Sequence, residues 1–170
     1  MTSIKEELLK GARAVQGCAD GMAQLGEAMG KEEMVQCFID RVDFCLAKNF
    51  PTKEYLKEFF GEVLGKKGIH VDERVKLTGG NAILLGNCEA ECDAEGYAVS
   101  RLYAKHDTRL EIWARDNAFV MVDALDDAGV IVHCKDEAKV VVNLYARATA
   151  TSDGDGHTRI VHKNKETYDL

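Results

Sequence analysis

The stretch that decides the fold reads AFVMVDALDD at residues 118–127, AGVIVHCKDE at 128–137 and AKVVVNLYAR at 138–147. Each of these ten-residue units begins with Ala, alternates apolar side chains with more variable ones, and ends with at least one charged residue. Such alternation is typical of a β-strand with one buried face. The three units therefore predict three short strands, each followed by a tight corner.

The same pattern continues in ten-residue units from Thr78 to about Thr167. At the third, fifth and seventh positions of nine such units, none of the 27 residues is charged. At the second, fourth, sixth and eighth positions, 17 of the 36 residues are Asp, Glu, Lys or Arg. Because one set avoids charge and the other carries it, the whole stretch predicts strands with an inner and an outer face.

The corners between units argue against a stack of hairpins. Hairpins need Gly-rich primed turns, and the corner pairs Asp116-Asn117, Asp126-Asp127 and Asp136-Glu137 do not supply them. Asp and Asn do suit other backbone turns. We therefore expect a parallel β-solenoid, in which each unit is one side of a coil and like sides stack about 4.8 Å apart.

The outward residues favour about 20 residues and two strands per turn. When alternate units share a face, one outer face is polar and the other collects apolar side chains, whereas grouping every third unit mixes the two sets. The apolar face contains Val99, Tyr103, Phe119, Met121, Leu125, Val141, Tyr145 and Val161. Such a face needs covering, by the N-terminal helices, by a partner or second copy of the chain, or by both.

The first 77 residues predict helices. Apolar spacing indicates an irregular helix over residues 3–29, weakened by four glycines, and a stronger one over 31–48. The chain's only proline ends the second, and Thr52 can cap a third helix that runs to Leu64.

The predicted fold class is α+β. A helical region over residues 1–77 precedes a β-solenoid domain over 78–170 and packs on it, and residues 69–77 alternate enough to form a short strand that feeds the repeats.

Charge and composition narrow the class of protein. Of the net charge of −7, the repeats carry −6, which disfavours binding to nucleic acids and to anionic membranes. No signal peptide or long apolar run is visible, so we expect a cytoplasmic protein of bacterial origin whose six cysteines are thiols.

The best candidate site lies on the polar outer face. Trp113 and His133 occupy the same position two units apart, so a two-sided coil makes them stacked neighbours beside Arg115, Glu111 and Asp93. This group could bind a sugar or another flat polar ligand. An ordinary cross-strand ladder is the alternative interpretation.

Three further motifs have simpler structural interpretations. Residues 153–157, DGDGH, resemble the start of a calcium loop but lack its closing acidic ligand. Cys88 and Cys92 lack further zinc ligands at a suitable spacing. The recurring corner Asp residues suit turn formation better than glycosidic catalysis. We therefore predict no metal, no cofactor and no catalytic residue.

Seven short segments carry a resemblance to other proteins. They are Lys48–Pro51, Glu54–Leu56, Leu85–Glu89, Gly96–Tyr103, Asp116–Val120, Ala138–Tyr145 and His162–Lys165. In these segments the chain resembles an uncharacterised family of proteins from gut anaerobes. The resemblance implies a helical N-terminal part and a repetitive β C-terminal part, with no known activity. The repeats are also loosely similar in shape to the β-solenoid heads of bacterial adhesins.

The sequence thus favours a non-enzymatic interaction or scaffold protein that presents a rigid surface to a protein or glycan. A partner or second copy is expected to bind the apolar face, through Tyr103, Phe119, Met121, Leu125, Val141 and Tyr145. The alternative is a carbohydrate-binding or carbohydrate-active protein that uses the polar face around Trp113.

Overall fold

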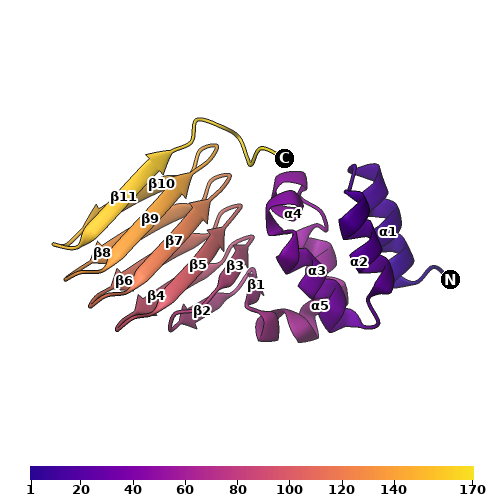
Figure 1. The fold of residues 1–170 in the computed structure, drawn as a ribbon, viewed down its shortest axis with the longest axis horizontal. Helices are drawn as coiled ribbons and strands as arrows, with labels where there is room; N and C mark the ends of the chain where they lie inside the picture. Colours follow the sequence, from indigo (N-terminus) through magenta and orange to yellow (C-terminus); the bar gives the residue numbers. More distant parts are fainter. The chain divides into compact units, whose positions relative to one another are not determined.

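The structure is a computed structural model that describes residues 1–170 and contains two compact units. The first consists of residues 1–67 and 168–170 and is helical, and the second consists of residues 68–167 and holds the strands (Figure 1). The sequence placed the boundary after residue 77, but residues 69–71 and 74–77 already pair with the sheets. Strand pairing therefore begins soon after the last helical stripe ends.

The helical unit contains five α-helices and one short 3-10 helix. They are α1 (Ile4–Ala14), α2 (Ala19–Glu27), α3 (Lys31–Asp40), α4 (Val42–Lys48), α5 (Lys53–Leu64) and η1 (Gly65–Lys67). The predicted caps are present, since the Ser3 side chain accepts from the Glu6 backbone N–H and Thr52 accepts from that of Tyr55. The first of these is a complete capping box, which fixes where α1 begins.

Two predicted helices are each divided in the structure. The helix predicted over 3–29 is interrupted where Gln16 adopts a φ of 64° and Gly17 N–H donates to the Ala12 carbonyl at 2.8 Å. The helix predicted over 31–48 is interrupted at Arg41, whose φ of −121° is not helical. No proline or glycine marks the second break, so residue type alone did not predict it.

The core of the helical unit is built from successive pairs of helices. Helix α1 packs on α2, α2 on α3, and α3 on α5. The buried apolar residues are Leu8, Ala12, Ala28, Val35, Phe38, Cys45, Leu46, Leu56, Phe60, Val63 and Leu64.

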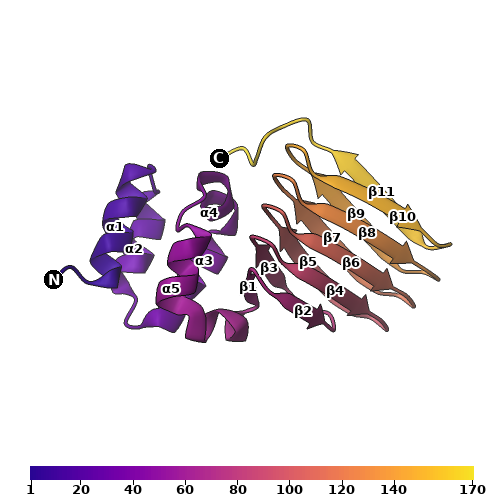
Figure 2. The ribbon, with the colours of Figure 1, turned by 180° about the vertical axis from the view of Figure 1, so that it is seen from behind.

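The second unit is a parallel β-solenoid of two sheets (Figures 1 and 2). The strands are β1 (Ile69–Val71), β2 (Arg74–Leu77), β3 (Ala82–Leu85), β4 (Glu89–Ala94), β5 (Val99–Ala104), β6 (Arg109–Ala114), β7 (Phe119–Ala124), β8 (Gly129–Cys134), β9 (Lys139–Leu144), β10 (Thr149–Asp153) and β11 (His157–His162). One sheet contains all the odd-numbered strands, and the other contains all the even-numbered ones. Chain neighbours therefore lie in opposite sheets.

The predicted turn length is confirmed by the strand register. Phe119 pairs with Val99, and Val130 pairs with Leu110, so equivalent residues lie 20 apart in both sheets. This offset corresponds to two strands per turn, as the outward residues indicated.

The solenoid interior is a continuous apolar core. The residues predicted to face inward in β4 to β9 are all buried, with exposed fractions of 4% or less. Small side chains such as Ala94, Ala104 and Ala114 end the inner rows of β4, β5 and β6, where the chain turns its corner. The two sheets can therefore approach closely at the corners.

The corners use left-handed backbone conformations and a ladder of side-chain hydrogen bonds. Gly96 N–H donates to the Asp116 carboxylate at 2.9 Å, and Asp116 N–H donates to that of Asp136 at 3.1 Å. Asp136 N–H in turn donates to Asp155 at 3.2 Å. These recurring aspartates therefore serve turn formation, each holding the corner one turn earlier.

The last turn of the solenoid is shorter than the others. In β11, Thr158 pairs with Val140, an offset of 18 residues instead of 20. The chain closes this turn through Gly154, at a φ of 96°, where an added Cβ would lie 2.0 Å from the Cys134 carbonyl oxygen. The DGDGH motif is thus a close backbone crossing that only glycine permits.

Candidate functional site

The five predicted site residues lie on the outer face of the even-numbered strands. Register places Asp93, Trp113, His133 and Asp153 in one row across β4, β6, β8 and β10. The outward residues Glu111 and Arg115 lie two positions to either side of Trp113 along the chain. The structure therefore brings all five to one surface, and it adds Asp153.

Trp113 and His133 form a stacked pair. Their ring centroids are 5.0 Å apart, and their planes differ by 27°. The imidazole Nε2 lies 2.8 Å from Glu111 Oε1, and Nδ1 lies 2.8 Å from Asp153 Oδ1. Hydrogen bonds to Glu111 and then to Asp153 raise the pKa of His133 above its ordinary value of 6.5. The ring is thus held between two carboxylates and against the indole.

Arg115 organises the carboxylates on the other side of Trp113. Its two Nη atoms lie 2.7 Å from Asp93 Oδ1 and 2.6 Å from Glu95 Oε2. Hydrogen bonds from Arg115 and His133 therefore engage the carboxylates nearest to Trp113. The indole itself is 38% exposed.

A groove of about 760 Å³ lies along the same face, next to this row. It is lined by Arg74, Val75, Lys76, Glu89, Ala90, Glu91, Arg109, Leu110, Glu111, Gly129, Val130, Ile131, Thr149, Ala150 and Thr151. Gly129 leaves room in it, because an added Cβ would lie 3.2 Å from the Arg109 side chain. The sequence prediction missed this groove, although a glycine at an outward strand position was a signal for it.

The face of the odd-numbered strands holds the predicted interface residues. Tyr103, Phe119, Met121 and Val141 are half-buried, whereas Leu125 and Tyr145 are buried and Val99 is 68% exposed. Coverage of this face by the helical region or by a partner stays a prediction.

The same face contains a polar network that the apolar pattern concealed. Arg101 Nη2 lies 2.7 Å from Asp123 Oδ2, and Asn143 Nδ2 donates to Asp123 Oδ1 at 2.8 Å. The Asp123 carboxylate is 2% exposed. A buried carboxylate with two partners is a fixed part of the sheet surface.

The cysteines and the acidic last turn form no metal site. All six cysteines are free thiols, and no group of three or more His, Cys, Asp or Glu side chains could hold a metal ion. Burial raises the pKa of the Cys88 and Cys92 thiols, so both are protonated apolar residues of the core. Asp153 and Asp155 instead bond to His133 and to the Asp136 backbone.

Comparisons with known proteins add no identity to this geometry. No protein family, curated protein or solved structure matches the chain. No helix has both the length and the apolar character required to cross a membrane.

Proposed function

We propose that this protein is a non-enzymatic interaction protein whose solenoid presents a rigid polar face to a glycan. The observation that carries the proposal is the groove of about 760 Å³ on the even-numbered strands, next to the exposed indole of Trp113. The groove crosses five strands, β2 to β10, so it suits an extended ligand better than a compact one.

The chemistry of the groove supports a polyhydroxylated ligand. Its walls carry cationic and anionic groups of both signs as well as the hydroxyls of Thr149 and Thr151. Such groups donate to and accept from sugar hydroxyls, and an aromatic ring beside them packs on the apolar side of a sugar. Glu111 belongs to both the groove and the His133 cluster, and so connects the two.

The ion pairs around Trp113 favour binding over catalysis. Glu111 and Asp153 hold His133, and Arg115 holds Asp93 and Glu95. A glycosidase needs two carboxyl groups that face the scissile bond, one as acid and the other as base or nucleophile. The engaged carboxylates instead fix the shape of the surface. A carbohydrate-active enzyme is therefore the less favoured proposal.

Intrinsic fluorescence tests the proposal directly, because Trp113 is the only tryptophan. We expect at least one neutral, basic or acidic oligosaccharide from a soluble panel to change Trp113 emission with a saturable dose response. Gly129→Phe should weaken that binding about tenfold or more, since a benzyl group fills the groove while the flexible Arg109 can move aside.

Lys139→Phe is the matched control. Lys139 is an outward residue of the odd-numbered strands, in the unit that follows that of Gly129, and its substitution should leave glycan affinity unchanged. If no oligosaccharide alters Trp113 emission, or if Gly129→Phe binds as the unsubstituted protein does, the glycan proposal is wrong.

A protein partner or a second copy on the odd-numbered strands is the second candidate. The supporting observation is Val99, which is 68% exposed beside the half-buried Phe119 with which it pairs. Self-association that Val99→Asp abolishes, measured by light scattering of the eluting protein, supports this candidate.

The expected compartment stays the cytoplasm, supported by the six free thiols. Membership of the uncharacterised gut-anaerobe family likewise stays a proposal, supported by the agreement in architecture.

A further inference from the structure

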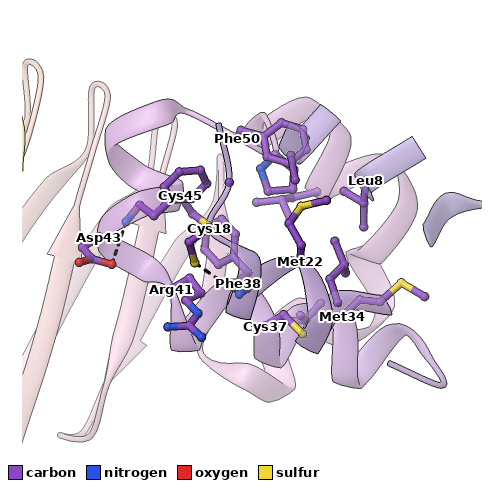
Figure 3. A pocket seen from close by; sticks show the side chains of 18 of the residues that line it. Leu8, Cys18, Met22, Met34, Cys37, Phe38, Arg41, Asp43, Cys45 and Phe50 are labelled. Atoms are coloured by element: carbon purple, nitrogen blue, oxygen red, sulfur yellow. Dashed lines mark hydrogen bonds between the residues drawn. The ribbon is translucent and has the colours of Figure 1, made fainter. Parts of the chain in front are cut away.

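The helical unit encloses a cavity of about 310 Å³ that no sequence motif indicated (Figure 3). Residues from all five α-helices, the segment after α4 and the C-terminal residue form its wall. They are Leu8, Ala12, Gly17, Cys18, Gly21, Met22, Leu25, Met34, Val35, Cys37, Phe38, Arg41, Asp43, Phe44, Cys45, Phe50, Pro51, Leu56, Phe60 and Leu170. Most of these side chains are apolar, and only two are charged.

The cavity has an apolar side and a polar side. In Figure 3, Leu8, Met22 and Phe50 lie on one side, and Arg41 and Asp43 lie on the other. The guanidinium group is the only cationic side chain in the lining. Few polar groups at one end of an apolar wall are typical of a site that orients a ligand.

Arg41 has hydrogen-bonding capacity that the protein does not use. Its Nε is buried and has no acceptor. A buried donor without a partner is costly, by about 1–3 kcal/mol. The side chain projects from the break between α3 and α4, and Gly21 of α2 leaves space beside it, since an added Cβ would lie 3.6 Å from Nε. An oxygen of a bound anion can therefore satisfy this donor.

The carboxylates nearest to Arg41 in sequence have other partners. Asp40 accepts from Gln24 at 2.6 Å and from Gln36 at 2.9 Å. Asp43 accepts from the Phe44 backbone N–H at 2.8 Å. Neither makes an ion pair with Arg41, so the guanidinium keeps its charge available to a ligand.

The thiols in the lining do not compete for this role. Burial raises the pKa of Cys45 to about 12, and burial together with the Asp40 charge raises that of Cys37. Both thiols are therefore neutral at physiological pH and contribute polarizable, weakly polar surface.

We propose that this cavity binds a small amphipathic anion, a carboxylate with an unbranched apolar chain. The carboxylate accepts from Arg41 Nε–H, and the chain lies among Met22, Leu25 and Phe38. A water molecule occupies about 30 Å³ of liquid, so a cavity of this size admits roughly ten heavy atoms. Octanoate, with an eight-carbon chain, is thus a suitable probe. This inference is independent of the glycan proposal, because the two sites lie in different units.

Calorimetric titration with octanoate and its neutral analogue octanamide tests the assignment. We expect the unsubstituted protein to bind octanoate about tenfold or more tightly than octanamide, because only the anion forms a charge-assisted bond with Arg41. Arg41→Gln should weaken octanoate binding about tenfold to a hundredfold and leave octanamide binding nearly unchanged.

Two further variants locate the site. Arg13→Gln removes an exposed positive charge of α1, outside the cavity lining, and should leave octanoate affinity unchanged. Ala12→Leu extends a side chain of the lining and should weaken both probes. Absence of octanoate binding, equal affinity for the two probes, or unchanged binding to Ala12→Leu would overturn the proposal. The comparison of probes on the unsubstituted protein decides the role of charge even if Arg41→Gln does not fold.

Discussion

At the scale of single residues, the corners of the solenoid concentrate unusual backbone conformations. His106, Asp116, Asp126, Asp136 and Ala146 all hold a positive φ between 51° and 62°. Asp and His are enriched in this region, and several of these side chains bond to the adjacent turn. Ala146 has no side-chain group that could compensate for the steric cost of about 1–2 kcal/mol.

Ala146→Gly should therefore stabilise the protein by up to about 1 kcal/mol, because glycine relieves the left-handed strain but gains freedom in the unfolded chain. The melting temperature should rise by roughly 2–4 °C. The control is Ala148→Gly in the same corner, where the buried methyl group is lost without relief of strain and the melting temperature should fall. A decrease for Ala146→Gly contradicts the interpretation of strain.

His133 supplies a pH-dependent contribution to stability. Because its pKa is raised in the folded state by Glu111 and then Asp153, its interactions stabilise the protein fully below pH 6.5. This contribution is lost as the pH rises through the folded-state pKa. The stability difference between the unsubstituted protein and His133→Gln should thus be larger at pH 6 than at pH 8.5. Thermal unfolding at both pH values measures it, and NMR of the imidazole gives the pKa. An equal difference at both pH values rules out the coupling.

At the scale of the element, the alternating strand pattern was predictable because a period of two is fixed by backbone geometry. Each inner row required only that charge be absent from every second residue. Two local features escaped this logic. Arg41 interrupts a helix without a helix-breaking side chain, and Asp123 lies on a face that reads as apolar because its charge is balanced by Arg101 from the neighbouring strand. Both depend on contacts between distant residues.

The buried pair on the odd-numbered strands should matter more than an exposed one. Asp123→Ala removes the carboxylate that holds Arg101 and Asn143, and we expect a loss of about 2–3 kcal/mol, since one partner is half-exposed. Asp127→Ala breaks the exposed pair with Arg147 and should cost less than about 1 kcal/mol. Chemical denaturation compares the two, and similar losses would show that burial does not control the energy of these pairs.

At the scale of the whole molecule, the candidate ligand sites were the least predictable part. The row of Trp113 and His133 followed from turn length, because one number fixes every neighbour in a stacked coil. The groove and the helical cavity depend on which side chains leave space, and that information lies in packing between several elements. The early start of the solenoid had a weak signal in the alternation of residues 69–77.

The solenoid should open from its C-terminal end. The central strands β5 to β8 have fully buried inner rows, whereas β10 and β11 contain no buried residue. Backbone amides of β10 and β11 should therefore exchange with deuterium at least tenfold faster than those of β6 and β7. Hydrogen exchange followed by mass spectrometry measures this gradient. Uniform protection along the coil would instead indicate a single cooperative unit.

The two-sided coil also limits how such a gene can change in length. Equivalent positions recur after 20 residues, so duplication of one full turn lengthens the stack by about 4.8 Å and leaves every downstream side chain on its own face. Duplication of half a turn exchanges the two sheets for all residues that follow, and moves the row of Trp113 away from its partners. Insertions and deletions tolerated within this region should therefore come in multiples of a whole turn, which makes the solenoid a molecular ruler with a fixed graduation.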